Sequence, residues 1–325
     1  MNKIYIIVVL VIFLFSCKND SKKTLPTITG KAGEVVVVIE KNVESSDAGQ
    51  LLKKILTQEV IGLPQAEPSF DYVNIPTNAF SSIFKSHRNI IVCELNKSEE
   101  KGKIIVKKDV WASPQIFINI IAKSETILES LIKTNENLII SSLLEAEEQR
   151  IVDNYTKYQD KSISNEILKK YDISLKIPKG FTLDLAKDNF AWISHETPQV
   201  SQGIFIYYYN YTDTNQFSKQ SLIDARDEFL KKYVPGPREN SYMSTEHNYE
   251  INYHEFMIDS VYIAKLMGLW KVEGDYMGGP FVSYSTPDTK RGRLVTVEGY
   301  VYAPRFEKRN YIRQVEGILS TIKIK

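Results

Sequence analysis

Apolar positions along the chain follow two repeats, and these repeats predict the secondary structure. The apolar run 90–95 is typical of a buried strand, and period-two alternation in 173–178 and 293–302 indicates half-buried strands. In other segments, such as 218–233 and 307–321, apolar residues recur every three or four positions, which indicates amphipathic helices. Strands alternate with helices in the first half of the chain, whereas grouped strands followed by single helices make up the second half.

The order of these elements predicts an α+β protein with two domains. We expect residues 34–160 to form a mixed α/β layer. We expect residues 161–325 to form an antiparallel sheet with helices packed on one face. The order of elements from Ile173 to Tyr233 is similar to PsbP/Mog1-like folds in architecture only, and a likeness of architecture implies no activity.

The most hydrophobic segment lies at the start of the chain. Lys3 precedes an unbroken apolar run, Ile4 to Phe15, and polar residues follow Cys17 at once. The run is shorter than the roughly 20 residues of a transmembrane helix, and its layout is that of a secretory signal. Leu14-Phe15-Ser16-Cys17 resembles the bacterial lipobox, which implies cleavage before Cys17 and acylation of that cysteine.

This segment predicts where the protein is held. We expect residues 1–16 to be a lipoprotein signal peptide, and the polar residues 17–33 to be a lipidated, flexible tether. The expected location is a bacterial cell envelope, at the outer rather than the inner membrane, with the N-terminal lipid as the membrane contact. The alternatives are a cleaved signal without lipid and an uncleaved anchor.

Composition narrows the function without identifying it. The chain has 41 Lys+Arg and 40 Asp+Glu, and the signal contributes Lys3 alone, so the rest is balanced. A balanced chain has no overall field to attract nucleic acid, and we expect no such partner. Cys93 is the one other cysteine and lies in an apolar strand, which predicts a core thiol and no disulfide.

Common catalytic and phosphate-binding motifs are missing from the sequence. It contains no G-x-S-x-G, P-loop, C-x-x-C or H-E-x-x-H pattern. Its four histidines are scattered, whereas a zinc site needs three or four converging ligands. We therefore expect no metal, no cofactor and no catalytic residue, and the sequence favours a protein that is not an enzyme without deciding the question.

Three C-terminal segments stand out in composition. They are Gly274-Asp275-Tyr276-Met277-Gly278-Gly279-Pro280, Glu298-Gly299-Tyr300-Val301-Tyr302-Ala303-Pro304 and the pair Lys308-Arg309. These segments resemble a family of uncharacterised bacterial envelope lipoproteins of the Bacteroidetes type, the domain of unknown function DUF4837. The resemblance implies an envelope location and carries no activity.

The same region offers a candidate binding surface. Alternation along 293–302 places Val295, Val297 and Val301 on one face of a strand, and aromatic and polar residues on the other. Tyrosines offer contact area and a hydroxyl group, which suits binding. The candidate residues are Trp270, Asp275, Glu298, Tyr300, Tyr302 and Arg309. The alternative, which we favour, is a structural role: a tight glycine turn and an ion pair of Glu298 with Arg309 or Arg313.

A second aromatic stripe, Phe205, Tyr207, Tyr209 and Tyr211, follows one face of another predicted strand. We expect it to pack beneath a helix, with Leu222 and Phe229 as partners. If its tyrosines were exposed, they could instead stack on sugar rings.

The leading hypothesis is a lipid-anchored envelope protein with a non-catalytic binding or assembly role, whose partner is an envelope protein or glycan. One alternative is an envelope hydrolase acting on glycan or peptide, with Asp275 and Glu298 as a carboxylate pair. Another is a carbohydrate-binding module that uses the tyrosine stripe.

Overall fold

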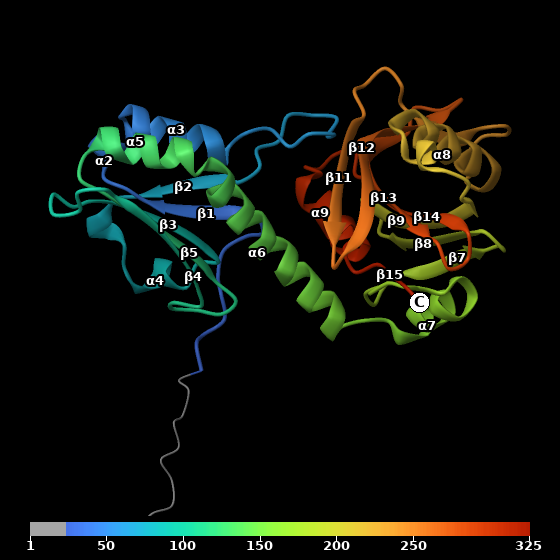
Figure 1. Cartoon of the computed structure of the whole chain (residues 1–325), viewed down its shortest axis with the longest axis horizontal. Helices are drawn as coiled ribbons and strands as arrows, with labels where there is room; N and C mark the ends of the chain where they lie inside the picture. The colour runs from blue at the N-terminus through green and yellow to red at the C-terminus, as the bar shows by residue number, and fades with distance from the viewer. Residues whose placement is uncertain (1–23) are drawn as a thin grey trace, which may run out of the picture.

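The computed structural model describes residues 24–325 and confirms the α+β class. Two large sheets lie in separate parts of the chain, and the long helix α6 runs from the first toward the second (Figure 1). The predicted signal peptide, the lipobox and Cys17 lie outside the described residues. Among the described helices, none is both long and apolar enough to cross a membrane.

The N-terminal domain, residues 24–157, is built on a five-stranded sheet of order β2-β1-β3-β5-β4. Neighbouring strands are parallel except for β4, which is antiparallel to β5. The strands are β1 (Glu34–Val38), β2 (Asp71–Ile75), β3 (Asn89–Leu95), β4 (Lys103–Lys108) and β5 (Ile116–Ala122).

Four helices of this domain share one core with the sheet. They are α2 (Lys41–Glu44), α3 (Asp47–Leu56), α5 (Glu125–Thr134) and α6 (Glu136–Lys157). The opposite side carries the 3-10 helix η2 (Thr77–Ala79) and α4 (Ser82–Lys85). These two short helices are separate because Phe80 and Ser81 between them have non-helical backbone angles.

Part of the predicted tether is held against this domain. Thr27 and Thr29 form bridges with Ser113 and His87. Residues 27–29 are therefore fixed by backbone pairing, and the expectation of a free tether up to residue 33 is wrong for this stretch.

The C-terminal domain, residues 161–325, has an eight-stranded antiparallel sheet of order β10-β12-β13-β14-β9-β8-β7, with β11 paired to β12. The strands are β7 (Thr182–Ala186), β8 (Phe190–Glu196), β9 (Ser201–Asn210), β10 (Tyr242–Thr245), β11 (Asn252–Ile258), β12 (Val261–Glu273), β13 (Gly278–Asp288) and β14 (Arg293–Tyr302). The remaining elements are α7 (Lys161–Tyr171), β6 (Ile173–Ser174), η3 (Thr214–Phe217), α8 (Lys219–Tyr233), α9 (Arg309–Leu319) and β15 (Lys323–Ile324).

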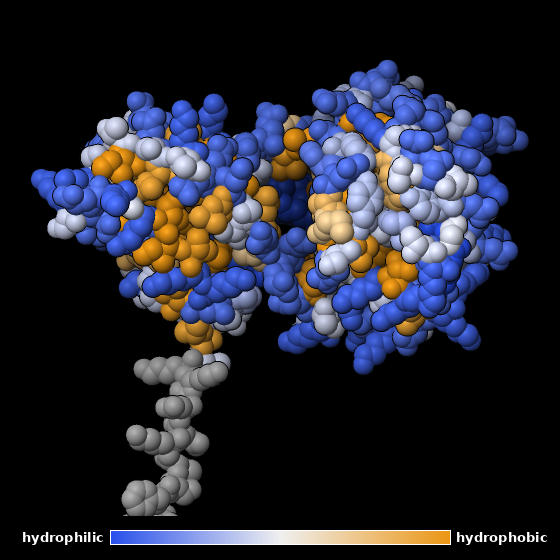
Figure 2. Space-filling view, viewed as in Figure 1, coloured by the Kyte–Doolittle hydropathy of each residue, from blue (hydrophilic) through white to orange (hydrophobic). Residues whose placement is uncertain are grey.

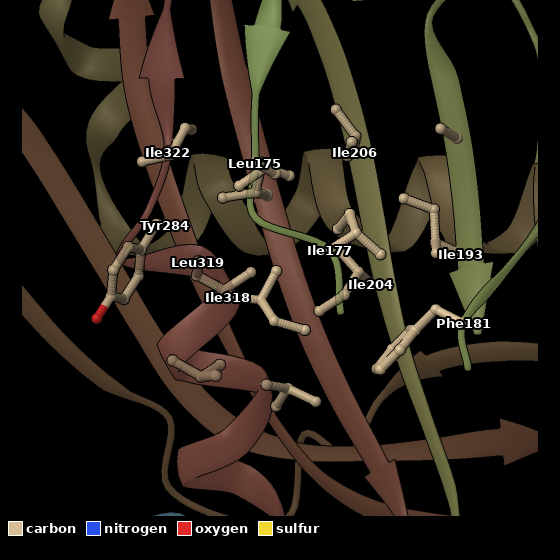
Figure 3. Close-up of a cluster of buried hydrophobic side chains, with 14 of the residues drawn as sticks. Leu175, Ile177, Phe181, Ile193, Ile204, Ile206, Tyr284, Ile318, Leu319 and Ile322 are labelled. Carbon is tan, nitrogen blue, oxygen red and sulfur yellow. The ribbon is translucent and has the colours of Figure 1, made fainter. Parts of the chain in front are cut away.

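Successive side chains along these strands point to opposite faces of the sheet, and each face has a hydrophobic core of its own. Val295 and Val297 share a core with α9, part of which is drawn in Figure 3 around Ile318 and Leu319. Leu294 shares the other core with α8. The predicted division of β14 into two faces is confirmed. The expectation that the helices share one face is wrong, because α8 covers the face opposite to α9.

Candidate binding pocket

A pocket opens at one end of the eight-stranded sheet, on the face that α8 covers. Strands β8, β12 and β14 end there, β9 and β13 begin there, and the loops after α8 and β14 form its sides. Its volume is about 590 Å³, and small-molecule sites are typically about 300–1,000 Å³. The lining is rich in aromatic, methionine and proline side chains, including Trp192, Met243, Trp270, Met277, Tyr300, Tyr302, Pro235, Pro237 and Pro304.

Tyr300 forms the inner wall of the pocket. Its ring stacks on Phe205, with 4.9 Å between the ring centres. Gly203 lies opposite Tyr300 on the neighbouring strand, and a Cβ atom at that position would be 2.1 Å from the tyrosine ring. A glycine is therefore required for the ring to lie flat on β9. Burial raises the pKa of Tyr300 well above its usual range, so this wall carries a neutral phenol.

The two indole N–H groups of the pocket are used within the fold. Trp192 Nε1 donates a hydrogen bond to the Tyr300 hydroxyl at 3.1 Å, and Trp270 Nε1 donates to the Val301 carbonyl oxygen at 3.2 Å. Gly279 lies beside the second bond, where a Cβ atom would be 2.1 Å from the same carbonyl oxygen. The tryptophans therefore contribute apolar ring surface to the lining rather than hydrogen-bond donors.

Charged groups of the lining lie at its rim. Glu196 and Arg305 are exposed, and the Ser201 hydroxyl donates to Glu196 Oε1 at 2.5 Å. The wall is thus apolar and aromatic, while a carboxylate and a guanidinium flank the opening. This arrangement suits a ligand that buries an apolar group and keeps a polar part at the rim.

Residues 160–321, which contain all residues of the pocket, match the family model of a domain of unknown function, DUF4837. This part of the chain belongs to the DUF4837 family. Residues 28–156 match a second domain of unknown function, DUF8532. None of the curated proteins matches the chain. The resemblance to DUF4837 inferred from the three C-terminal segments is confirmed, whereas the envelope lipoprotein of the Bacteroidetes type stays a prediction. Residues 160–321 are called the DUF4837 domain below.

The structure brings together three of the six predicted site residues of the DUF4837 domain. All three of these line the pocket: Trp270, Tyr300 and Tyr302. The centre of the Trp270 ring lies 5.8 Å from that of Tyr300 and 6.1 Å from that of Tyr302. The sequence analysis did not identify Trp192, Met243 or Met277 as site residues. Trp192 lies on β8, and the pairing of β8 with β9 places it next to Tyr300.

Glu298 has a structural role, with a different partner from those predicted. It is fully buried on the α8 face of β14, and its carboxylate accepts two hydrogen bonds from Arg226 of α8, at 2.9 and 2.8 Å. The predicted pairing with Arg309 or Arg313 is wrong, because both arginines belong to α9 on the other face.

Asp275 lies in the turn between β12 and β13, where Gly274 has a φ of +85°. Its carboxylate pairs with Arg238 at 3.0 Å. Glu298 is opposite Ser283, and β13 extends from there to Gly278, about 16 Å at 3.3 Å per residue. Asp275 lies beyond that strand end, so the carboxylate pair expected for a hydrolase is not formed.

Arg309 connects the two domains. Its guanidinium binds Asp71 of β2 at 3.0 and 2.8 Å and donates to the Pro68 carbonyl oxygen at 2.7 Å. The Glu67 carboxylate accepts hydrogen bonds from the backbone N–H groups of Lys308 and Arg309 at the start of α9. The predicted binding role of Arg309 is therefore replaced by a role in holding the N-terminal domain.

The tyrosine stripe on β9 packs beneath α8, as the favoured interpretation predicted. Tyr207 is 1 % exposed, and its ring stacks on Phe229 with 4.7 Å between centres. Tyr209 is partly buried and also lies beside Phe229. A sugar-binding platform formed by Tyr207 and Tyr209 is inconsistent with this packing.

Proposed function

We propose that this protein is held at a bacterial cell envelope by an acylated Cys17, and that the pocket of its DUF4837 domain binds an apolar segment of an envelope protein without catalysis. The observation that supports binding is the pocket itself, whose lining is aromatic and apolar and whose indole N–H groups are already bonded within the fold. Aromatic anchors in such pockets supply much of the energy of protein–protein contacts.

The lining favours an apolar group over a sugar. Val200, Val234 and Val272 join the proline and methionine side chains in it. Sugar hydroxyls need hydrogen-bond partners when they leave water, and an apolar wall leaves them unsatisfied. A glycan is therefore the second candidate ligand, and its polar groups would have to use the rim around Glu196 and Arg305.

A non-catalytic role is consistent with the groups in the pocket. Among the described lining residues, Glu196 has the one carboxylate, and none is a histidine or cysteine. Glycoside hydrolysis usually needs two carboxyl groups on either side of the bond, and a nucleophilic mechanism needs an activated nucleophile. For these reasons, a hydrolase is the second candidate function, after non-catalytic binding.

Site-specific photocrosslinking in intact cells tests the binding proposal. A photoreactive phenylalanine analogue is placed at Arg305, on the rim, and in a control at Lys290, an exposed residue in the turn at the far end of the sheet. We expect one reproducible crosslinked protein from position 305 and none from position 290. Mass spectrometry identifies it.

The Tyr302→Ala variant distinguishes specific from incidental crosslinking. Tyr302 is partly buried, whereas Trp270 and Tyr300 are 2 % and 4 % exposed, so trimming Tyr302 disturbs the core least. We expect at least a fivefold loss of the product from position 305. An undiminished product would count against the pocket, and crosslinking to glycan alone would favour the carbohydrate-binding alternative.

Labelled palmitate tests the anchor independently. The wild-type chain should incorporate the label and remain with the membrane fraction, whereas Cys17→Ser should do neither. Equal labelling of both chains would contradict acylation at Cys17.

A further inference from the structure

The five-stranded sheet of the N-terminal domain has a thinly covered face. Its small core consists of Val36, Val38, Ile75 and Ile90. In the described part of the chain, the segment η2–α4 and the loop that carries Trp111 pack over this core. Phe117 and Val92 are only partly buried there, so the apolar surface continues across β5 and β3.

The segment η2–α4 exposes apolar groups beside a lysine. Ile83 is 72 % exposed, and Phe80 and Phe84 are partly buried on either side of it. Lys85 Nζ lies 6.0 Å from the centre of the Phe80 ring and 5.7 Å from that of Trp111. Figure 2 shows apolar side chains gathered on the N-terminal domain, over the strands of its sheet. Exposed aliphatic and aromatic groups flanked by lysine are typical of surfaces that lie in a membrane interface.

The start of the described chain is fastened beside this surface. The Ser113 N–H donates to the Pro26 carbonyl oxygen at 2.9 Å, and the Thr29 N–H donates to the Ser86 carbonyl oxygen at 2.8 Å. Ser113 belongs to the loop of Trp111, and Ser86 directly follows α4. The chain therefore enters the domain between the two segments that bear the exposed apolar groups.

Chain length sets how far this surface can lie from Cys17. Thr24 lies seven residue steps after Cys17, and a fully extended chain covers at most about 3.6 Å per step, or about 25 Å in all. An acyl chain on Cys17 would thus keep Thr24, just before the point where the chain is fastened beside this surface, within about 25 Å of the bilayer. Such a short connection gives the surface a high effective concentration at the membrane, so even weak contacts become populated.

Charge on this face fits anionic headgroups. Lys107 is exposed on β4 opposite Phe117, which places it on the same face. It lies at the end of the sheet where the chain enters, because β4 ends where β5 begins. Asp109 is exposed nearby and accepts a hydrogen bond from the Gln115 N–H. Glu34, on the same face of β1 as Val36, accepts a hydrogen bond from the Lys31 N–H at 2.8 Å. Lysines near a membrane surface are attracted to anionic lipids, and Lys85 and Lys107 are the groups here that can meet them.

We propose that Phe80, Ile83, Phe84, Lys85 and Trp111, together called the docking patch, contact the surface of the bilayer that holds the N-terminal lipid. This inference rests on the proposed acylation of Cys17. Ile83 and the aromatic rings lie among the lipid headgroups, and Lys85 and Lys107 meet anionic headgroups beside them. The N-terminal sheet is thereby oriented on the membrane.

Fluorescence quenching by brominated lipids tests the docking. The chain from Cys17 onward is coupled through that thiol to a maleimide lipid in vesicles of phosphatidylcholine and phosphatidylglycerol, with or without brominated acyl chains. Cys93 is buried, and burial raises its pKa to about 12, so it does not compete for the maleimide. We expect lower tryptophan fluorescence in the brominated vesicles.

Matched variants assign the signal to the patch. Trp111→Phe should abolish the difference between the two vesicle types, because Trp192 and Trp270 lie in the DUF4837 domain. Ile83→Ser should reduce it at least twofold, and its exposure means that the fold is retained, which an unchanged unfolding midpoint verifies. Met257→Ser, which alters a 59 % exposed residue of β11, is the control and should behave as wild type.

Equal fluorescence of the wild-type chain in both vesicle types would overturn the docking. So would quenching that persists in Trp111→Phe, because another surface would then meet the lipid. Chemical coupling supplies the anchor in this experiment, whereas the palmitate experiment tests acylation in cells. Failure of the patch and failure of the proposed anchor are therefore distinguishable.

Discussion

Arg226 and Glu298 form a fully buried ion pair between α8 and the middle of β14. The third guanidinium nitrogen of Arg226 donates to the Thr245 hydroxyl at 2.7 Å, and the guanidinium carbon lies 3.8 Å from the centre of the Phe281 ring. Burial raises the pKa of Glu298, and Arg226 opposes that shift. The pair orients α8 on the sheet next to the candidate pocket.

Removing one partner of this pair should lower the free energy of unfolding far more than removing both. Arg226→Met leaves the Glu298 carboxylate buried and uncompensated, and we expect the free energy of unfolding to fall by about 3–5 kcal/mol at pH 7. The double variant Arg226→Met/Glu298→Leu should recover most of that loss, because no buried charge remains. Urea unfolding of the wild-type chain and the two variants measures both values.

The pH dependence of the single variant provides a further readout. Burial already raises the pKa of Glu298, and without Arg226 it should rise further above its unfolded value, so the folded chain binds a proton more readily. The variant should therefore regain stability as the pH falls below 7, and the double variant should not. The control Arg238→Met removes an exposed partner of Asp275 and should change stability little.

At the scale of elements, α9 packs against α6 through a glycine. A Cβ atom on Gly317 would lie 2.5 Å from Cγ2 of Ile151, which belongs to α6. This close approach brings a helix of the DUF4837 domain against the longest described helix of the N-terminal domain.

Gly317→Ala should therefore destabilise the protein, although alanine has a higher helix propensity than glycine. Alanine usually stabilises a helix by about 1 kcal/mol relative to glycine. Here the added methyl group collides with Ile151, and we expect a net loss of about 1–3 kcal/mol. The double variant Gly317→Ala/Ile151→Ala removes the colliding atom. Its loss in the free energy of unfolding should be smaller than the sum of the losses in the two single variants. Additive losses in urea unfolding would show that the two residues are not coupled.

Periodicity predicted the separate elements well and their arrangement poorly. The strands expected at 90–95 and 293–302 are β3 and β14, and the helix expected at 218–233 is α8, because each depends on a local pattern of apolar residues. Which face of the sheet α8 covers depends instead on how the chain connects β9 to β10. No local repeat contains that information.

The candidate site was likewise predicted in its local features and missed in its long-range contacts. Trp270, Tyr300 and Tyr302 were predicted together because aromatic residues gather in three short segments, and they line one pocket. Glu298 was assigned a partner on the nearest helix in sequence, but residue 226 reaches it across the sheet. Partners so far apart in the chain follow from topology, which a single sequence does not show.

At the scale of the whole molecule, the N-terminal domain caps a helix of its neighbour. Glu67 is 3 % exposed, and its carboxylate accepts hydrogen bonds of 2.7 and 2.9 Å from the Lys308 N–H and of 2.7 Å from the Arg309 N–H. A negative charge at the N-terminus of a helix is favourable, because unpaired N–H groups point outward there. The contact therefore links stability of α9 to the position of the other domain.

Glu67→Ala should loosen the two domains without unfolding either. It leaves two buried N–H groups unpaired, and each such group costs about 1–3 kcal/mol. We expect α9 to lose protection from hydrogen exchange in its first turn, and the radius of gyration measured by small-angle X-ray scattering to increase as the domains separate. Glu59→Ala, an exposed substitution in the same connecting segment, is the matched control.

The same variant separates the roles of the two domains. If Glu67 acts only between domains, Glu67→Ala should leave crosslinking at position 305 intact, since the pocket lies wholly within the DUF4837 domain. It should also leave quenching at Trp111 intact, since the docking patch lies wholly within the N-terminal domain. Loss of either signal, with no change in the radius of gyration, would mean that Glu67 stabilises one domain internally rather than joining the two.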